Sequence, residues 1–325
     1  MRIACQILSL VRQFLRNFGE YCDKFVVFAI NSGMSEIPLR DAKSDLLHRC
    51  QADSRLAQKP PPRAVIYRRD TTSPLESHLY EPVLCLVLQG TKTMRSGDIE
   101  VEVGPGDALV VSHHLPVLSQ ITQATPAFPY LAVVLTLDMA MTRDLLAQIS
   151  TLPERGENAR AVSCETHDAL WFEPLYRYLR MVEDQQALEV LGPAVLREVH
   201  YRLLMSRNGA ILWDTILRDS HTSRISRAIA RMRTDLSTSL KVADLASEVG
   251  MSASTFHSHF KAVTGTTPLQ YQKDLRLIRS RDLIEGGTHS VSSTAFALGY
   301  ESPTHFSRDY KRKFGHNPSA ARHQS

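Results

Sequence analysis

The segment Gly299-Tyr-Glu-Ser-Pro-Thr-His-Phe-Ser-Arg-Asp-Tyr-Lys-Arg-Lys-Phe-Gly-His-Asn-Pro-Ser319 decides the fold of the C-terminal third of the chain. Phe306 and Tyr310 are four residues apart, so both lie on one face of a helix. Ser302, which precedes them, can accept the free backbone N–H groups of the first helical turn. Gly299 suits the left-handed backbone that ends a preceding helix. The segment therefore predicts two helices joined by a tight turn.

An earlier copy of the same pattern lies upstream. Val242, Ala246, Val249 and Gly250 match Val291, Ala295, Leu298 and Gly299 at an offset of 49 residues. After one inserted residue, Ser252, Phe256, Phe260, Lys261, Gly265 and Pro268 match Ser302, Phe306, Tyr310, Lys311, Gly315 and Pro318 at an offset of 50. Helix, turn, helix is the module whose second helix enters the DNA major groove. A single copy would be a weak signal, whereas two copies predict a DNA-binding domain.

The charge of the chain is unevenly distributed along its length. The 325 residues carry a formal net charge of +4. Residues 219–325 contain fifteen basic and nine acidic side chains, which leaves the first 218 residues slightly acidic. A basic end suits a polyanionic partner such as DNA. The length suggests about two domains, and the hydrophobic fraction of 43% excludes wholesale disorder.

Residues 60–137 predict an all-β domain. Strands are expected at 63–68, 84–88, 99–103, 108–112, 116–121 and 130–137. Gln89-Gly90 and Ser96-Gly97-Asp98 supply the turn chemistry between them. Several short strands at this spacing favour a sandwich or a barrel, and no helical pattern separates them as parallel βαβ units require.

Beyond Asp138 the apolar period becomes that of helices. These are expected at 139–149, 170–182 and 193–205, with Pro174 and Pro193 in first turns. Helices beside a small β domain serve either as a dimer surface or as a lid on the β core. The sequence leaves both interpretations open.

The segment 299–319 closely resembles the signature of the AraC/XylS family of bacterial transcription regulators. Residues 250–268 fit the first module of that family, and Leu269–Glu285 resembles the long helix that joins its two modules. The β region resembles the AraC-type cupin-like N-terminal domain in three stretches, Leu79-Tyr-Glu-Pro82, Val87-Leu-Gln-Gly90 and Leu115-Pro-Val117.

The resemblance implies an α+β multidomain fold. A cupin-like β-barrel with two or more helices is expected over 41–210, as a sensing or dimerisation domain. An all-α domain of two helix-turn-helix modules joined by a long helix is expected over 219–325. Residues 1–40 are expected to be an N-terminal extension. Either translation starts at Met1 and part of this extension forms an amphipathic helix, or translation starts at Met34.

The resemblance also implies the function of a sequence-specific DNA-binding transcription regulator. Its partners would be a double-stranded DNA operator, a small-molecule effector, RNA polymerase and a second copy of the chain. No cofactor, metal or membrane partner is expected, and the odd cysteine count without a C-x-x-C pair fits a reducing cytoplasm. The resemblance does not say whether the regulator activates or represses transcription. We expect an activator.

The DNA contacts are expected on the outward faces of the two second helices. The resemblance assigns them to Ser254, His257, Ser258, Lys261, Thr304, Ser307, Arg308, Lys311 and Arg312. Arg308 is expected to contribute most, through a base edge or a phosphate, because arginine pairs bidentately with guanine. The alternatives for Arg308 are a solvated charge on the helix face and an ion pair with Asp309 or Glu301. Lys261, Lys311, Arg312 and Lys313 are expected to contact phosphates.

The effector is expected among polar or reactive groups in otherwise apolar strands. The candidates are Tyr80, Glu81, Cys85, Gln89 and His113. A shared metal at His257 and His259 is excluded, because residues two apart on a helix face different ways. His259 is expected to pack against its own module.

Two other function classes fit the sequence less well than a regulator does. An enzyme would need a catalytic constellation, and the sequence contains no legible triad, carboxylate pair or phosphate loop. An architectural DNA binder would leave the roughly 150 residues of the N-terminal domain without a purpose. Regulation is therefore the favoured function, and no catalytic residue is assigned.

Overall fold

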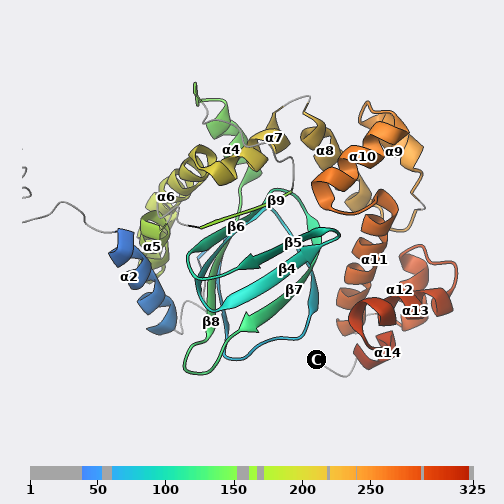
Figure 1. The fold of residues 1–325 in the computed structure, drawn as a ribbon, viewed down its shortest axis with the longest axis horizontal. Coiled ribbons are helices and arrows are strands. Elements are labelled where there is room, and N and C mark those ends of the chain that lie inside the picture. Colours follow the sequence, from blue (N-terminus) through green and yellow to red (C-terminus); the bar gives the residue numbers. More distant parts are fainter. Residues whose placement is uncertain are drawn as a thin grey trace, which may run out of the picture.

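The computed structural model describes residues 39–52, 61–151, 161–166, 172–217, 220–238, 240–286 and 289–321. A β-rich domain comes first and a helical domain follows it along the chain, lying against one side of the β structure (Figure 1). The alternative start at Met34 lies outside the described residues. None of the helices in the described ranges is long and apolar enough to cross a lipid bilayer.

The β structure consists of two antiparallel sheets. One has the order β1-β8-β3-β6-β9 and the other β2-β7-β4-β5. The strands are β1 (Ala64–Arg69), β2 (Glu76–Tyr80), β3 (Val83–Gln89), β4 (Thr91–Ser96), β5 (Ile99–Val103), β6 (Asp107–Val111), β7 (Leu115–Gln123), β8 (Tyr130–Thr136) and β9 (Val162–Thr166). The sheets face each other without joining into a closed barrel, which is the one difference from the expected cupin-like fold.

The six strands expected from the sequence are all present, but three others were not foreseen. β2, β4 and β9 have the sequences ESHLY, TKTMRS and VSCET, which lack the apolar runs of β3 or β8. β2 and β4 each pair with β7, and β9 completes the other sheet beside β6. These strands form because an established neighbour offers backbone partners, which outweighs their polar composition.

Alternate residues of the central strand β3 face two different cores. Leu84, Leu86 and Leu88 pack with the helices of the first domain. Val83, Cys85 and Val87 point between the two sheets. This alternation follows from the two-residue period of a strand. Because both faces are covered, the whole of Val83–Leu88 is buried and reads as a continuous apolar run.

The helices of the first domain cover the outer face of the five-stranded sheet (Figure 1). They are α2 (Leu39–Ala52), α4 (Met139–Leu146), α5 (Phe172–Arg180), α6 (Gln185–Met205) and α7 (Ala210–Ile216). α7 continues the domain past the expected boundary at 210, because Leu212 and Trp213 are buried in the same core.

The expected helix start at Pro193 is wrong. α6 begins eight residues earlier, where the Asp184 side chain accepts the backbone N–H of Ala187, and Pro193 lies inside the helix. Proline there removes one bond to the carbonyl of Glu189. Both residues are exposed, so water can reach that carbonyl and the helix continues.

The helical domain has the expected duplicated order. It consists of α8 (His221–Thr234), α9 (Val242–Glu248), α10 (Ala253–Thr264), α11 (Pro268–Glu285), α12 (Val291–Ala297), α13 (Pro303–Phe314) and α14 (Pro318–Ala321). The joining helix expected at 269–285 is confirmed as α11. Phe256 and Phe260 of the first module belong to an apolar cluster that is continuous with the core between the sheets, whereas Phe306 and Tyr310 form a separate small core.

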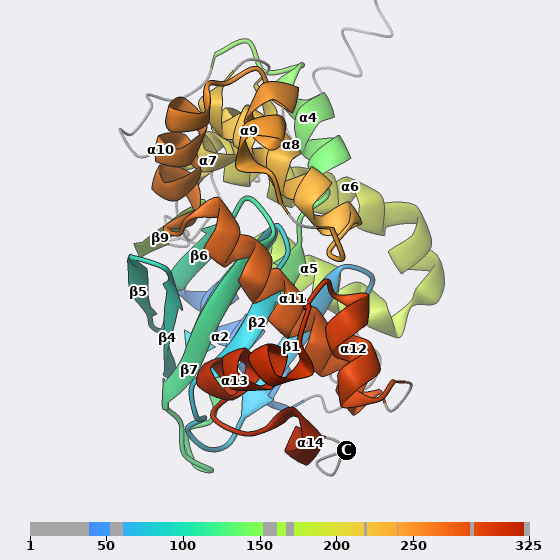
Figure 2. The same ribbon diagram turned by 90° about the vertical axis from the view of Figure 1, so that its right-hand side faces the viewer.

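The first module is docked on the β domain by backbone hydrogen bonds. The Asp98 N–H donates to Gly265 O at 3.1 Å, and the Ala161 N–H donates to Val263 O at 2.9 Å. The Tyr271 hydroxyl of α11 donates to His114 O. A Cβ atom on Gly97 would lie 1.9 Å from Gly265 O, so this contact requires glycine. α11 thereby lies across the strands β2 and β7 (Figure 2).

Candidate nucleic-acid interface and ligand cavity

Each module holds its second helix by the local chemistry expected from the sequence. Ser252 accepts the Thr255 N–H at the start of α10, and Ser302 accepts the Thr304 N–H at the start of α13. Gly250 and Gly299, in the turns between the helices, have φ values of +69° and +74°. Phe256 and Phe306 are completely buried. The capping serines, left-handed glycines and inward aromatics are therefore confirmed.

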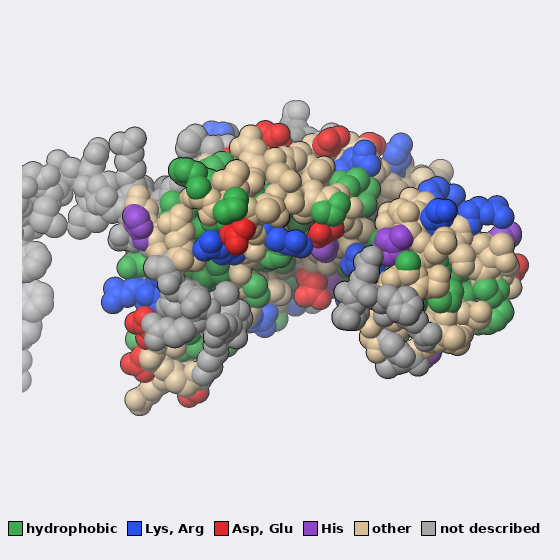
Figure 3. Space-filling view, turned by 90° about the horizontal axis from the view of Figure 1, so that it is seen from below, with side chains coloured by type: hydrophobic (Ala, Val, Ile, Leu, Met, Phe, Trp, Pro, Cys, Tyr) green, Lys and Arg blue, Asp and Glu red, His purple; other side chains and the backbone are tan. Residues whose placement is uncertain are grey.

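The side chains expected to contact DNA lie on the outer faces of these helices. All are exposed except Ser307, which is half-buried: Ser254, His257, Ser258, Lys261, Thr304, Arg308, Lys311 and Arg312. Lys and Arg side chains gather along the outer edge of the helical lobe at the right of Figure 3. Each second helix therefore offers a polar outer face over an aromatic inner face.

Arg308 has no ion-pair partner among the described residues, although Asp309 follows it directly. The Asp309 carboxylate instead binds Lys273 Nζ of α11 at 2.6 Å and Arg312 Nη2 at 2.6 Å. Asp309 points inward, with 15% of its side chain exposed. The expected alternative of an Arg308–Asp309 pair is therefore not formed, and the guanidinium of Arg308 is available to a ligand.

Lys313 is largely buried and paired with an acid, so the structure does not favour the phosphate contact expected for this residue. Its Nζ lies 2.7 Å from Asp274 Oδ1 of α11, and only 12% of its side chain is exposed. Two ion pairs therefore join α11 and α13. In the Lys273–Asp309 pair α11 supplies the base, and in the other pair α11 supplies the acid. Partly buried pairs of this kind fix orientation more than they add stability. They hold the second recognition helix on the joining helix.

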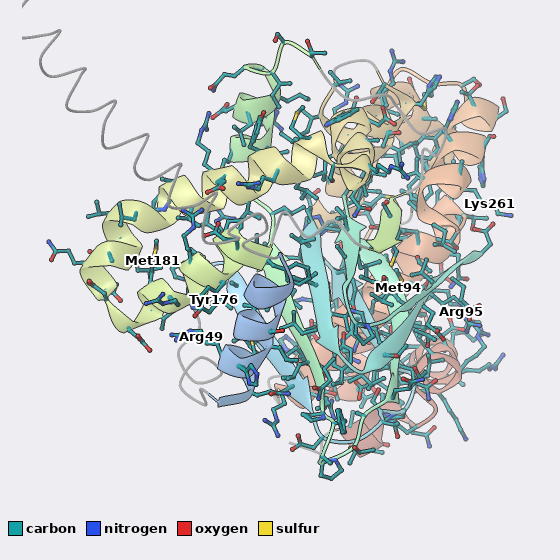
Figure 4. All side chains as sticks on the ribbon, turned by 60° about the vertical axis from the view of Figure 1, so that its left-hand side comes forward. Arg49, Met94, Arg95, Tyr176, Met181 and Lys261 are labelled. Atoms are coloured by element: carbon teal, nitrogen blue, oxygen red, sulfur yellow. The ribbon has the colours of Figure 1, made fainter. Side chains whose placement is uncertain are left out.

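Lys261 lies on α10 beside the β domain, above the end of β4 that carries Arg95 (Figure 4). Its Nζ is 3.9 Å from Asp98 Oδ2, and both side chains are more than half exposed. An exposed pair at this distance contributes little. A DNA phosphate would compete with Asp98 for the same ammonium group.

The spacing of α10 and α13 is set by α11. An 18-residue helix is about 27 Å long at 1.5 Å per residue. Successive major-groove faces on one side of B-DNA are about 34 Å apart. α10 packs at the start of α11, while α12 to α14 pack along the rest of it. The two second helices therefore pack at different points along one continuous helix.

A cavity of about 290 Å³ lies between the two sheets of the β domain. Tyr80, Glu81 and Cys85, three of the five expected effector residues, line it. The other two do not. Lys92 and Tyr130 also line the cavity and were missed. Lys92, Met94 and Ser96 are every second residue of β4, and all three are buried. This two-residue period is the sequence signal that could have placed Lys92 on the inner face of a strand.

Gln89 and His113 lie outside the cavity for separate reasons. A β-bulge between Val87 and Gln89 shifts the strand register, so Gln89 leaves the face that Cys85 occupies. Its amide binds Pro129 O and the Gln51 side chain of α2 instead. His113 follows β6 in a buried loop, where its Nδ1 is 2.8 Å from Ser112 Oγ.

The burial of His113 predicts that the stability of the fold depends on pH. Burial lowers the pKa of its imidazole to about 4, and burial also lowers the pKa of His114 to about 4. Between about pH 6.5 and 4 the unfolded chain binds protons that the folded chain does not, so stability falls as pH falls through this window. We expect a lower Tm at about pH 5 than at about pH 7.5, and a smaller difference in His113→Gln.

The control for this prediction is His305→Gln, which changes an exposed histidine of α13. Thermal unfolding followed by circular dichroism gives the Tm of each protein at both pH values. The His305 variant should lose as much Tm between the two pH values as the parent. An equal loss in the His113 variant would show that His113 does not couple folding to protons.

His259 packs against its own module, as expected. Its ring stacks on that of His221 of α8, with centroids 3.9 Å apart, whereas His257 is exposed. His259 is therefore part of the scaffold of α10, and His257 lies on its exposed outer face.

The duplicated helix pairs and the β domain match known families. Residues 60–211 match the AraC-type transcriptional regulator N-terminus. Residues 245–324 match a helix-turn-helix domain. The chain belongs to the AraC/XylS family. Both units of this AraC/XylS protein thus have counterparts in known regulators, in the expected order along the chain.

Curated relatives of this AraC/XylS protein include an activator and an uncharacterised regulator. The transcriptional activator RhaS of Escherichia fergusonii is 31% identical over 143 residues, which is 43% of this chain and 50% of RhaS. The uncharacterised HTH-type regulator YidL of Escherichia coli is 33% identical over 103 residues, 32% of this chain and 35% of YidL. The chain thus spans half or less of the length of these relatives.

A solved structure shares the fold of most of the chain. It is that of an apo ToxT variant from Vibrio cholerae, with a TM-score of 0.55 and 12% identity. The match covers 79% of this chain and 96% of that one. It therefore includes both the β domain and the helical domain in one arrangement.

Proposed function

We propose that this AraC/XylS protein binds a specific DNA sequence and regulates transcription from it in response to a small molecule. The observation that carries the proposal is the pair of recognition helices, α10 and α13, with exposed polar faces at different points along the single helix α11. A rigid spacing of two reading helices suits two successive major grooves. The domain bounds proposed for these activities are 41–210 and 219–325.

The base contacts are proposed for both second helices. Apart from Lys261, the exposed side chains proposed for α10 are short or of intermediate length, whereas α13 presents Arg308. We assign base reading to Ser254, His257, Ser258, Thr304, Ser307 and Arg308, and phosphate contacts to Lys261, Lys311 and Arg312. Arg312 would exchange its ion pair with Asp309 for a phosphate. The base-reading residues thus occupy the first turns of each outward face, and the phosphate-binding residues occupy the following turn of the same face.

The effector is proposed to bind between the sheets. The cavity there has a volume of about 290 Å³, which approaches the size of small-molecule sites in general. The helix α11 of the DNA-binding domain lies against β2 and β7, two strands whose residues line the cavity. A ligand that shifts these strands would therefore change the support under α11.

Further partners follow from the surface and from the relatives. RhaS is named an activator, and we extend that direction of control, with RNA polymerase as the target, to this chain. A second copy is proposed to pack on the outer face of α6, where Val190, Leu191 and Tyr201 are exposed. The inner face of the same helix covers the sheet, so α6 would serve as both lid and dimer surface. We place the protein in the cytoplasm and assign it no enzymatic role.

The test is selection of binding sites from random DNA by the purified full-length protein. We expect enrichment of one motif with two conserved blocks, one for each module. Sequence-independent binding would instead favour an architectural protein. Turnover of a cavity ligand would favour an enzyme.

Lys311→Ala tests the assignment of a phosphate contact. Lys311 is exposed on α13, and removing one phosphate contact lowers the slope of log K against log salt by about one unit. Affinity for the selected site and for unrelated DNA should fall together, because phosphates carry no sequence. Fluorescence anisotropy over a salt series measures both. A salt slope equal to that of the parent protein would remove Lys311 from the interface.

A further inference from the structure

A lysine lies at the closed end of the cavity between the sheets. Lys92 of β4 is 5% exposed, and its Nζ points into the cavity lining rather than to solvent. The ammonium is 3.2 Å from Cys85 Sγ and 3.4 Å from the Tyr80 hydroxyl. It also lies 5.4 Å from the centre of the Tyr80 ring. Arg95, on the same strand, is exposed instead.

The Lys92 ammonium has no carboxylate partner among the described residues. A buried charge without a counter-ion is costly, so buried lysines are normally paired. Burial alone would lower the pKa of Lys92, but the neighbouring Cys85, Tyr80 and Tyr130 hold it above its ordinary value. The closed end of the cavity therefore holds a positive charge that the folded chain leaves uncompensated by any described acid.

A second donor at this end is also unused. Tyr130 of β8 is 1% exposed, and no described residue accepts the proton of its hydroxyl. The Lys92 ammonium lies within reach of the phenol oxygen, which opposes the effect of burial on the pKa of Tyr130. Burial raises the pKa of Tyr130, so the phenol is neutral and keeps its proton for donation. Lys92 and Cys85 both influence it electrostatically, which places the three groups close together. Buried polar groups left unsatisfied in this way need an explanation.

The remainder of the cavity differs from its closed end. Its walls combine the apolar side chains of Leu79, Val83, Ile121, Ala132 and Val134 with the small polar side chains of Ser73, Ser119 and Thr136. Two carboxylates also line it: Glu76, which pairs with Arg69 and His78, and Glu81, which is 57% exposed and lies 3.8 Å from His114. The lining thus contains one buried cation, a largely apolar wall and two carboxylates with partners of their own.

We propose that the cavity binds a monocarboxylate with an apolar body, its carboxylate at Lys92 and Tyr130. The carboxylate accepts hydrogen bonds from Lys92 Nζ and the Tyr130 hydroxyl, and the body lies against the apolar walls. A second carboxylate on the ligand would meet Glu76 and Glu81. This assignment of ligand class rests on the proposed effector role of the cavity.

The experiment is titration calorimetry of the purified full-length protein with matched probes. The probes are octanoate and 3-phenylpropanoate, their primary amides, and the dicarboxylate octanedioate. We expect each monocarboxylate to bind the parent about tenfold or more tighter than its amide, because charge-assisted hydrogen bonds are the stronger ones. Octanedioate should bind more weakly than octanoate. Lys92→Met should abolish the preference for carboxylate over amide, and Tyr130→Phe should reduce it.

The matched control is Arg95→Met, which removes a cation from an exposed position of the same strand and should leave every affinity unchanged. Thermal unfolding checks that Lys92→Met folds, which is expected since apolar replacement of an unpaired buried charge is tolerated. If Lys92→Met does not fold, two other measurements test the proposal. These are the ratio of carboxylate to amide affinity in the parent and the reduction of that ratio in Tyr130→Phe.

The proposal is overturned if amides bind as tightly as carboxylates, if Lys92→Met keeps the preference, or if no probe binds the parent. Equal affinity for octanoate and octanedioate overturns it as well. None of these results affects site selection on DNA. Conversely, carboxylate binding by a protein without any preferred DNA sequence would contradict the regulator while supporting the ligand class.

Discussion

Arg308→Ala should weaken binding to the selected DNA site by roughly 5- to 150-fold, which corresponds to about 1–3 kcal/mol for one bidentate base contact. The side chain is exposed on α13, and its acidic neighbour Asp309 is already bound by Lys273 and Arg312. The guanidinium therefore gives up no internal ion pair when it binds DNA. Anisotropy titrations of the selected site and of unrelated DNA measure the change.

Arg308→Lys separates a base contact from a phosphate contact. Lysine keeps the charge but lacks the planar fork that binds two acceptors of guanine. If Arg308 reads a base, this variant loses nearly as much affinity as alanine and accepts other bases at one position of the site. Arg95→Ala, on an exposed arginine of the β domain, is the control. Parental affinity in Arg308→Ala would remove the leading contact from the interface.

Phe306→Ala should unfold the second module while leaving the rest of the protein folded. Phe306 is completely buried and belongs to a small core with Leu277, Ile284, Ala295 and Tyr310. Removing a buried phenylalanine costs about 3–5 kcal/mol, and a core this small has little further stabilisation to lose. The first module shares its core with the β domain and should remain folded.

Hydrogen exchange followed by mass spectrometry measures this effect segment by segment. In Phe306→Ala, we expect α12 and α13 to lose protection while α8 to α10 keep theirs. Phe296→Ala is the control, since Phe296 lies on α12 with 58% of its surface exposed, and surface changes usually stay within about 0.5 kcal/mol. Loss of protection throughout the helical domain would mean that the two modules fold as one unit.

The helix-turn-helix modules were predictable because their determinants are local. Ser252 and Ser302 cap helices a few residues away, and Gly250 and Gly299 adopt left-handed backbone within the same turns. Such features follow from residue type and short spacing alone. Because the helix-turn-helix pattern occurs twice, the segment between the two copies could be predicted as a joining helix. The predicted start at residue 269 is within one residue of the observed start of α11.

The cavity was only partly predictable because its lining depends on distant pairings. Cys85 was found from its strand, but the bulge that turns Gln89 away has no signature in the sequence. Lys92 lines the cavity through the pairing of β4 with β7, and β4 itself was not foreseen. In the same way, the contact of Lys313 with Asp274 depends on how α13 crosses α11. Local patterns cannot fix these crossings.

Hydroxyl-radical protection of the selected DNA site by the full-length protein tests the central claim most directly. The claim is that α10 and α13, spaced by α11, read two successive major grooves. We predict two protected patches on one face of the duplex, about one helical turn apart, and loss of one patch in Phe306→Ala. A single patch in the parent protein, or uniform protection without a preferred sequence, would contradict the account.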